Sequence, residues 1–183
     1  MQLTPSPFAP DHFPDLPDVA GVRAATGSRG FYARRGITRD DVFLFAFPEG
    51  TSAAGVFTRS LTASADVDWC RKALAESGGW ARGVVANAGN SNAFTGHAGV
   101  KKNDATLAAL ENEFGIDRKH FFLAATGVIG EPLADPNYVG AFVPELSAKL
   151  GNPDWEACAR AFMTTDTYPK GAGQTFDLGG TKV

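Results

Sequence analysis

The stretch Gly83-Val84-Val85-Ala86-Asn87, followed by an amphipathic segment at residues 100–114 and by His120-Phe121-Phe122-Leu123-Ala124, decides the fold. The two outer runs are short and apolar, and turn residues bound them, which is typical of buried strands. The segment between them repeats apolar residues at the period of a helix. Strand, helix and strand in this order predict a layered α/β domain.

The helix at residues 100–114 should cover the sheet with one face. Its apolar residues share a stripe, formed by Val100, Leu107, Leu110 and Phe114. The polar residues fall elsewhere on the helix, and we expect them away from the core: Lys101, Lys102, Asn103, Glu111 and Asn112.

Further elements flank this unit. Upstream, we expect strands at Gly21-Val22-Arg23-Ala24-Ala25, Val42-Phe43-Leu44-Phe45-Ala46-Phe47 and Ala54-Gly55-Val56-Phe57-Thr58, and a helix at residues 66–76. The second of these strands should be buried on both faces. Downstream, Asp135-Pro136 is typical of a helix start, and Pro144 should break that helix into two pieces. Asn152-Pro153 predicts the start of an amphipathic helix that buries Cys158.

The two ends of the chain differ from its middle. Five prolines punctuate the first 17 residues, so we expect an extended arm at residues 1–18 and a single α/β domain at residues 19–183. The end of the chain predicts a strand, the turn Gly179-Gly180 and the opening of a second strand. Because an unpaired edge is a liability, we expect the polypeptide to continue beyond Val183 or to pair with another chain.

Composition narrows the functional classes. The chain has 183 residues, 44% of them apolar, and a net charge of −3 without charge runs, which argues against nucleic acid and membrane surfaces as partners. Cys70 and Cys158 lie far apart and fit neither a disulfide scaffold nor a metal site. Neither a signal peptide nor a long apolar span is encoded. A cytoplasmic protein with small, soluble ligands is expected.

Three segments could carry chemistry. The loop Asn87-Ala88-Gly89-Asn90-Ser91-Asn92-Ala93-Phe94-Thr95-Gly96 offers many amides, which could bind a ligand or satisfy local backbone groups. Thr126 and Gly127 leave the strand that begins near His120. They could hold the negative oxygen of an acyl intermediate, or Thr126 could cap a helical turn. Thr165 lies in a threonine-rich group at residues 164–167, which could grip an amino acid or be a frayed helix end.

An attacking group is not evident. His12, His97 and His120 are scattered along the chain, and no serine occupies a G-x-S-x-G elbow. The hydrogen-bond donors at Thr126 and Gly127 therefore need a nucleophile from elsewhere.

Taken together and in order, these segments resemble the ornithine acetyltransferase family, and the resemblance covers most of the chain. Val19-Ala20-Gly21-Val22-Arg23-Ala24-Ala25 and Ala53-Ala54-Gly55-Val56-Phe57-Thr58 look like the family's opening strands. Three further segments follow in the family's order: Asn87-Ala88-Gly89-Asn90-Ser91-Asn92-Ala93, Ala125-Thr126-Gly127-Val128-Ile129-Gly130 and Thr164-Thr165-Asp166-Thr167.

The resemblance implies an α chain of a self-cleaved precursor, with an α/β/β/α sandwich of mixed sheets that a second, β chain completes. It implies that the β chain begins with a nucleophilic threonine and that two α and two β chains form a heterotetramer. Acetyl would pass from N-acetylornithine to that threonine and then to glutamate, without a cofactor or metal, with acetyl-CoA as a further possible acetyl donor. Thr126 and Gly127 would form the oxyanion hole, and Thr165 would contact substrate.

Two other functions fit the same residues. A related two-chain amidase or aminopeptidase would use the same oxyanion hole and pass the acyl group to water. A non-catalytic domain could use the Asn/Gly loop and the threonine group to bind an amino acid.

Overall fold

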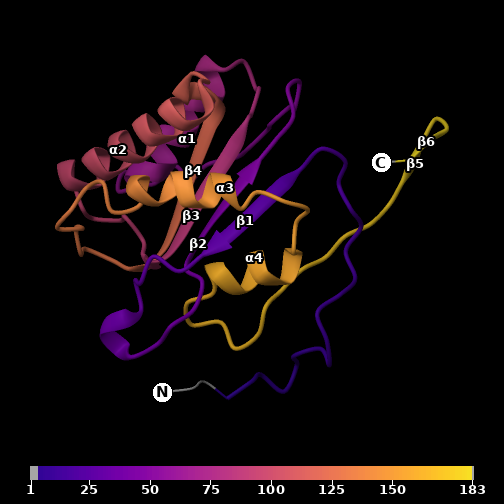
Figure 1. Ribbon diagram of the computed structural model, residues 1–183, viewed down its shortest axis with the longest axis horizontal. Helices are drawn as coiled ribbons and strands as arrows, with labels where there is room; N and C mark the ends of the chain where they lie inside the picture. The colour runs from indigo at the N-terminus through magenta and orange to yellow at the C-terminus, as the bar shows by residue number, and fades with distance from the viewer. Residues whose placement is uncertain (1–3, 183) are drawn as a thin grey trace.

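A computed structural model of the chain describes residues 4–182 (Figure 1). Its centre is a four-stranded mixed sheet in the order β1-β2-β3-β4. The strands are β1 (Arg23–Gly27), β2 (Val42–Ala46), β3 (Gly83–Asn90) and β4 (Phe121–Val128). Strand β2 pairs antiparallel with both β1 and β3, and β3 pairs parallel with β4. The prediction of an α/β fold with a mixed sheet is confirmed.

Most of the helices pack on one face of this sheet. They are α1 (Ala65–Glu76), α2 (His97–Phe114) and α3 (Val143–Ala148). Val42 and Leu44 of β2 share a core with Leu107 and Leu110 of α2 and with Leu146 of α3. Burying side chains of this size is the main force that holds the helices to the sheet.

The other face of the sheet carries α4 (Trp155–Phe162), which Figure 1 shows apart from the other three helices. Phe43 and Phe45 of β2 point to this side, with ring centroids 5.7 Å from Phe162 and 5.9 Å from Trp155, respectively. Both phenylalanines are only half-buried. The prediction that this strand is buried on both faces is therefore correct for the face toward α2 and α3, whereas the face toward α4 is only half-buried.

Both ends of the chain lie outside the packed sheet and helices (Figure 1). Residues 4–18 form neither helix nor strand, and Ser6 N donates to Thr167 Oγ1 at 3.1 Å. The predicted hairpin is confirmed as β5 (Asp177–Leu178) and β6 (Thr181–Lys182), which project from the body in Figure 1. Val183, the last residue of that prediction, lies outside the described residues, as do residues 1–3 of the predicted arm.

Two element predictions are wrong. Residues 54–58 form no strand, and Val56 is 99% exposed, because the antiparallel pairing of this segment stops at a bridge between Ser52 and Trp80. No helix starts at Pro136. A turn and the 3-10 helix η3 (Gly140–Phe142) come first, and Pro144 lies in the first turn of α3, where its missing N–H costs nothing.

The stripe predicted for α2 is correct only in part. Leu107 and Leu110 are buried, but Val100 is 48% exposed, whereas Lys102 and Asn103 are each only 4% exposed. Cys158 is buried as predicted. The second main sheet of an α/β/β/α sandwich is not present among residues 4–182 and stays a prediction.

Candidate functional site

The ends of β3 and β4 approach each other unusually closely. Gly127 has φ +130° and stands opposite Gly89, whose φ is +104°. A Cβ on Gly127 would lie 2.4 Å from the carbonyl carbon of Gly89, so no other residue fits there. Next to this contact the register shifts, and Asn90 pairs with both Thr126 and Val128. Irregularities of this kind are frequent beside active sites, where they change the direction of a strand end.

Thr126 has a hydroxyl that is available to a ligand. The residue is half-buried, in the last part of β4 and directly before Gly127. Across residues 4–182, its side chain makes no hydrogen bond to another residue. Within the described residues, Thr126 therefore does not cap a helical turn, which was its alternative role. A hydroxyl and a glycine backbone stand together at a strand end, where an anionic oxygen could accept hydrogen bonds.

The asparagine side chains of the loop at residues 87–96 form hydrogen bonds mainly with other groups of the protein. Asn87 Nδ2 donates to Asn90 O at 2.9 Å, Asn90 Nδ2 to Glu131 O at 2.5 Å and Asn92 Nδ2 to Asp66 Oδ2 at 2.7 Å. All three asparagines are buried. Their amides satisfy neighbouring protein groups, which was one of the two interpretations of the sequence, and they hold the turn beside Gly89.

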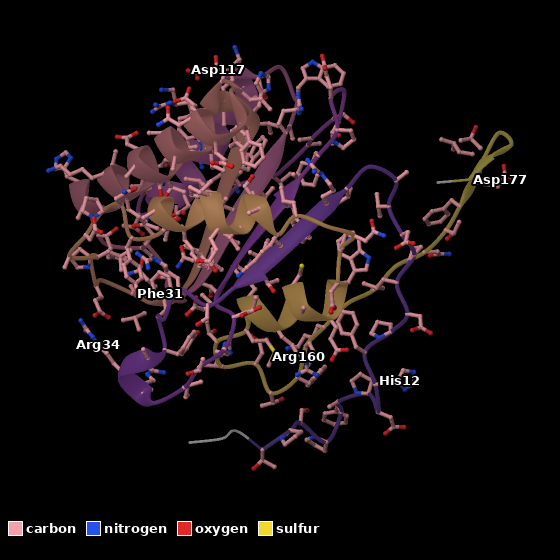
Figure 2. All side chains as sticks on the ribbon, viewed as in Figure 1. His12, Phe31, Arg34, Asp117, Arg160 and Asp177 are labelled. Atoms are coloured by element: carbon pink, nitrogen blue, oxygen red, sulfur yellow. The ribbon has the colours of Figure 1, made fainter. Side chains whose placement is uncertain are left out.

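A loop that the sequence interpretation missed lies over the strand ends. Asp41 is fully buried, and its carboxylate accepts hydrogen bonds from the backbone N–H of Arg29, Gly30 and Phe31. Burial raises the pKa of Asp41, although the three N–H groups and Arg39 oppose the rise. Phe31 is thereby held against Gly89, where an added Cβ would lie 2.6 Å from the Cβ of Phe31. Figure 2 labels Phe31 at this edge of the sheet.

The same loop contacts Met163, the residue directly before the threonine-rich group at residues 164–167. Tyr32 Oη donates to Met163 O at 3.3 Å, and the Arg39 guanidinium donates to Met163 O at 2.5 Å and lies over the Tyr32 ring. Thr165 itself is exposed. One loop thus contacts both the β3 end and the segment that carries Thr165. The one sequence signal for this loop was a pair of adjacent acids, Asp40 and Asp41, directly before an apolar strand.

The remaining chemical groups are dispersed. Lys170 Nζ donates to Asp166 at 2.6 Å, and this bond lowers the pKa of that exposed carboxyl. His97 begins α2, and His120 lies in the 3-10 helix η2 (Arg118–His120), with Nδ1 3.3 Å from Trp80 O. Among the described residues no three His, Cys, Asp or Glu side chains gather as metal ligands. In the same part of the chain no helix is long and apolar enough to cross a membrane.

These features define a class: an α/β domain in which the carboxyl ends of two parallel strands lie side by side, which is where open α/β sheets usually bind small ligands. The model of the ArgJ family matches residues 24–183. The arginine biosynthesis bifunctional protein ArgJ of Bartonella quintana is 44% identical over 183 residues, which is 100% of this chain and 43% of the relative. That of Caulobacter vibrioides is 44% identical over 172 residues, 93% of this chain and 42% of the relative. The chain belongs to the ArgJ family and spans less than half the length of these relatives.

Solved structures agree with this assignment. The crystal structure of ornithine acetyltransferase from Mycobacterium tuberculosis, complexed with ornithine, matches with a TM-score of 0.70 and 28% identity, over 90% of this chain and 93% of that chain. The arginine biosynthesis bifunctional protein argJ from Bacillus halodurans matches with a TM-score of 0.76 and 23% identity, over 90% and 83%. The second likeness concerns the fold alone.

Proposed function

We propose that this chain supplies the oxyanion hole and part of the substrate pocket of a glutamate N-acetyltransferase that moves acetyl from N-acetylornithine to glutamate. The observation that carries the proposal is the half-buried Thr126, whose hydroxyl makes no hydrogen bond within residues 4–182. It stands beside Gly127, where the close contact with Gly89 leaves no room for a side chain. The family match and the ornithine named for the Mycobacterium tuberculosis enzyme support the substrate class.

The attack comes from a second chain, whose first residue is a threonine. Its hydroxyl oxygen adds to the acetyl carbonyl, its proton passes to a nearby base, and the carbonyl oxygen becomes an oxyanion. The hydroxyl of Thr126 and the N–H of Gly127 donate to this oxyanion. The C–N bond to ornithine then breaks, and the leaving amine takes the proton. The glutamate amine then adds to the carbonyl of the acetyl-threonine ester and gives a proton to the base. The C–O bond to threonine breaks, the threonine oxygen takes that proton back, and N-acetylglutamate leaves.

The other parts of the proposal rest on the family resemblance. Thr165, in an exposed segment held by Tyr32 and Arg39, contacts the amino acid end of the substrate. The protein works in the cytoplasm as two α and two β chains. Acetyl-CoA, if used, acts as a second acetyl donor at the same threonine.

The lengths of the matched proteins support a second chain. The match covers 93% of a chain of the Mycobacterium tuberculosis enzyme but 43% of the Bartonella quintana relative. A chain of about the present size thus occurs in a solved structure, although curated relatives are more than twice as long.

The test is an acetyl-acceptor experiment on the intact protein that contains this chain. With N-acetylornithine and glutamate, N-acetylglutamate should form in step with ornithine. Without glutamate, release should stop near one ornithine per active site, since the acetyl group stays on the enzyme. Continuous acetate release without glutamate would instead favour the amidase. Amino-acid binding without any turnover would favour the binding domain.

A further inference from the structure

A buried ion pair lies below the loop that connects β3 to α2. Lys102 of α2 and Asp66 of α1 have side chains that are each only 5% exposed, with Nζ and Oδ1 4.0 Å apart. Lys102 Nζ donates to Asn87 Oδ1 at 2.7 Å. Burial lowers the pKa of Lys102 and raises that of Asp66, while each charge opposes the shift of the other. Two charges buried this deeply need hydrogen bonds from further groups in addition to their mutual attraction.

The cluster is also incomplete. Asn103 Oδ1 accepts a hydrogen bond from Asn92, but Asn103 Nδ2 is buried and has no partner among the described residues. Lys102, Asp66 and Asn103 all line one cavity of about 10 Å³. A cavity of roughly this size holds a single water molecule when two or more polar groups face it. The 4.0 Å gap between Nζ and Oδ1 is too long for a direct hydrogen bond and fits a bridged one.

From this cluster, hydrogen bonds run to the two strand ends that flank the proposed oxyanion hole. Lys102 fixes the oxygen of the Asn87 amide, which orients its nitrogen toward Asn90 O. Asn90 Nδ2 in turn donates to Glu131 O, four residues after Gly127. The chain of bonds therefore spans the two strand ends on either side of the contact between Gly89 and Gly127.

We propose that Lys102, acting through Asn87 and completed by one internal water molecule, is a positioning residue for Thr126 and Gly127. It touches no substrate. It holds the turn after β3 so that the donors of the neighbouring strand end stay aimed at one point. The inference rests on the proposed function, because it concerns the geometry of that oxyanion hole.

The test compares Lys102→Met with Lys101→Met in the intact protein. Lys101 is exposed on the same helix, so its variant controls for loss of charge. Lys102→Met should lower kcat about 10²-fold, as small displacements of catalytic groups do. KM should stay within about twofold, because an interaction that acts only in the transition state leaves ground-state binding unchanged.

The double variant Asp66→Asn with Lys102→Met separates positioning from folding, and it serves also if the single variant does not fold. Removing both charges should bring Tm back toward the wild-type value. The kcat should remain low, since Asn87 has still lost its donor. Recovery of kcat together with Tm would overturn the proposal, because a purely structural role predicts it.

Two further measurements complete the test. A Thr126→Ala variant, assayed alongside, separates the two claims: if it keeps wild-type kcat, the proposed function fails, whereas if only Lys102→Met keeps it, the positioning role fails. A high-resolution crystal structure should show one water molecule within hydrogen-bond distance of Lys102 Nζ and Asn103 Nδ2. An empty cavity there would overturn the bridging water.

Discussion

Single residues at the open edge of the sheet set its geometry. Gly127 and Gly89 both have positive φ and touch through their backbones, which no pair of larger residues allows. The sequence pointed to Thr126 and Gly127 because a Thr-Gly pair follows a strand. It did not point to Gly89 as the partner, since the contact depends on how β3 and β4 align.

Replacing Gly127 by Ala should unfold or distort this edge. The added Cβ would overlap Gly89, and φ +130° is unfavourable for any L side chain. We expect a loss of several kcal/mol in unfolding free energy, above the roughly 1–3 kcal/mol of strained backbone alone. Gly36→Ala is the matched control, because Gly36 also has positive φ but nothing within 4 Å of the new Cβ. Equal losses in chemical denaturation would mean that the strand contact is unimportant.

The two cysteines should be inert in the folded protein. Burial raises the pKa of both Cys70 and Cys158 to about 11, so little reactive thiolate exists at pH 8. A thiol reagent should label neither in the native protein and both after denaturation. The raised pKa also makes the free energy of unfolding depend on pH, because the folded state binds the thiol proton more tightly than the unfolded state. The contribution of the thiols is complete below their ordinary pKa of 9.0 and is lost as the pH rises through about 11. Rapid native labelling would contradict the burial.

At the scale of elements, the apolar pattern predicted the positions of most strands and helices. It failed where an element or a side chain depends on a partner that is distant in sequence. The β2, β3 and β4 strands and α1, α2 and α4 all lie where the pattern placed them, with ends displaced by up to about four residues. The strand expected at residues 54–58 lacks a neighbour to pair with, which a local pattern cannot reveal. The buried Lys102 pairs with Asp66 and the buried Asn103 accepts from Asn92, and neither partner could be found from the local pattern of the helix.

The start of α4 offers a direct test of an element boundary. Asp154 is its N-cap, with Oδ1 accepting from Ala157 N at 2.9 Å, although Asn152-Pro153 had been the expected start. Asp154→Ala should cost about 1 kcal/mol, a fall in Tm of about 2–4 °C. Asp154→Asn should cost far less, since asparagine caps as well. If both variants melt alike, the cap does not anchor this helix.

At the scale of the whole molecule, the main structure of the described residues is a four-stranded mixed sheet. The ends of β3 and β4 carry the proposed hydrogen-bond donors, Thr126 and Gly127, and we found no nucleophile beside them within residues 4–182. The family resemblance predicted a second main sheet and a second chain. Residues 4–182 form no second main sheet, and both stay predictions, because a local pattern cannot show what a partner adds. Part of the sheet face beside α4 stays half-exposed, as Phe43 and Phe45 show.

Division of the protein into two chains can be tested by mass. Intact-mass and N-terminal analysis of the natural protein should find a companion chain that begins with threonine. Residues 1–183 expressed alone should show no acetyl transfer, and activity should require the companion. Turnover by the isolated chain would contradict the two-chain account.

The most direct test of the central claim is the kcat of Thr126→Ala in the intact protein, measured with N-acetylornithine and glutamate. An exposed threonine, Thr62→Ala, is the control. Loss of one donor from an oxyanion hole should lower kcat about 10²–10³-fold, with Tm and KM little changed. A Thr126→Ala protein that turns over at the wild-type rate would remove this hydroxyl from the reaction and contradict the account.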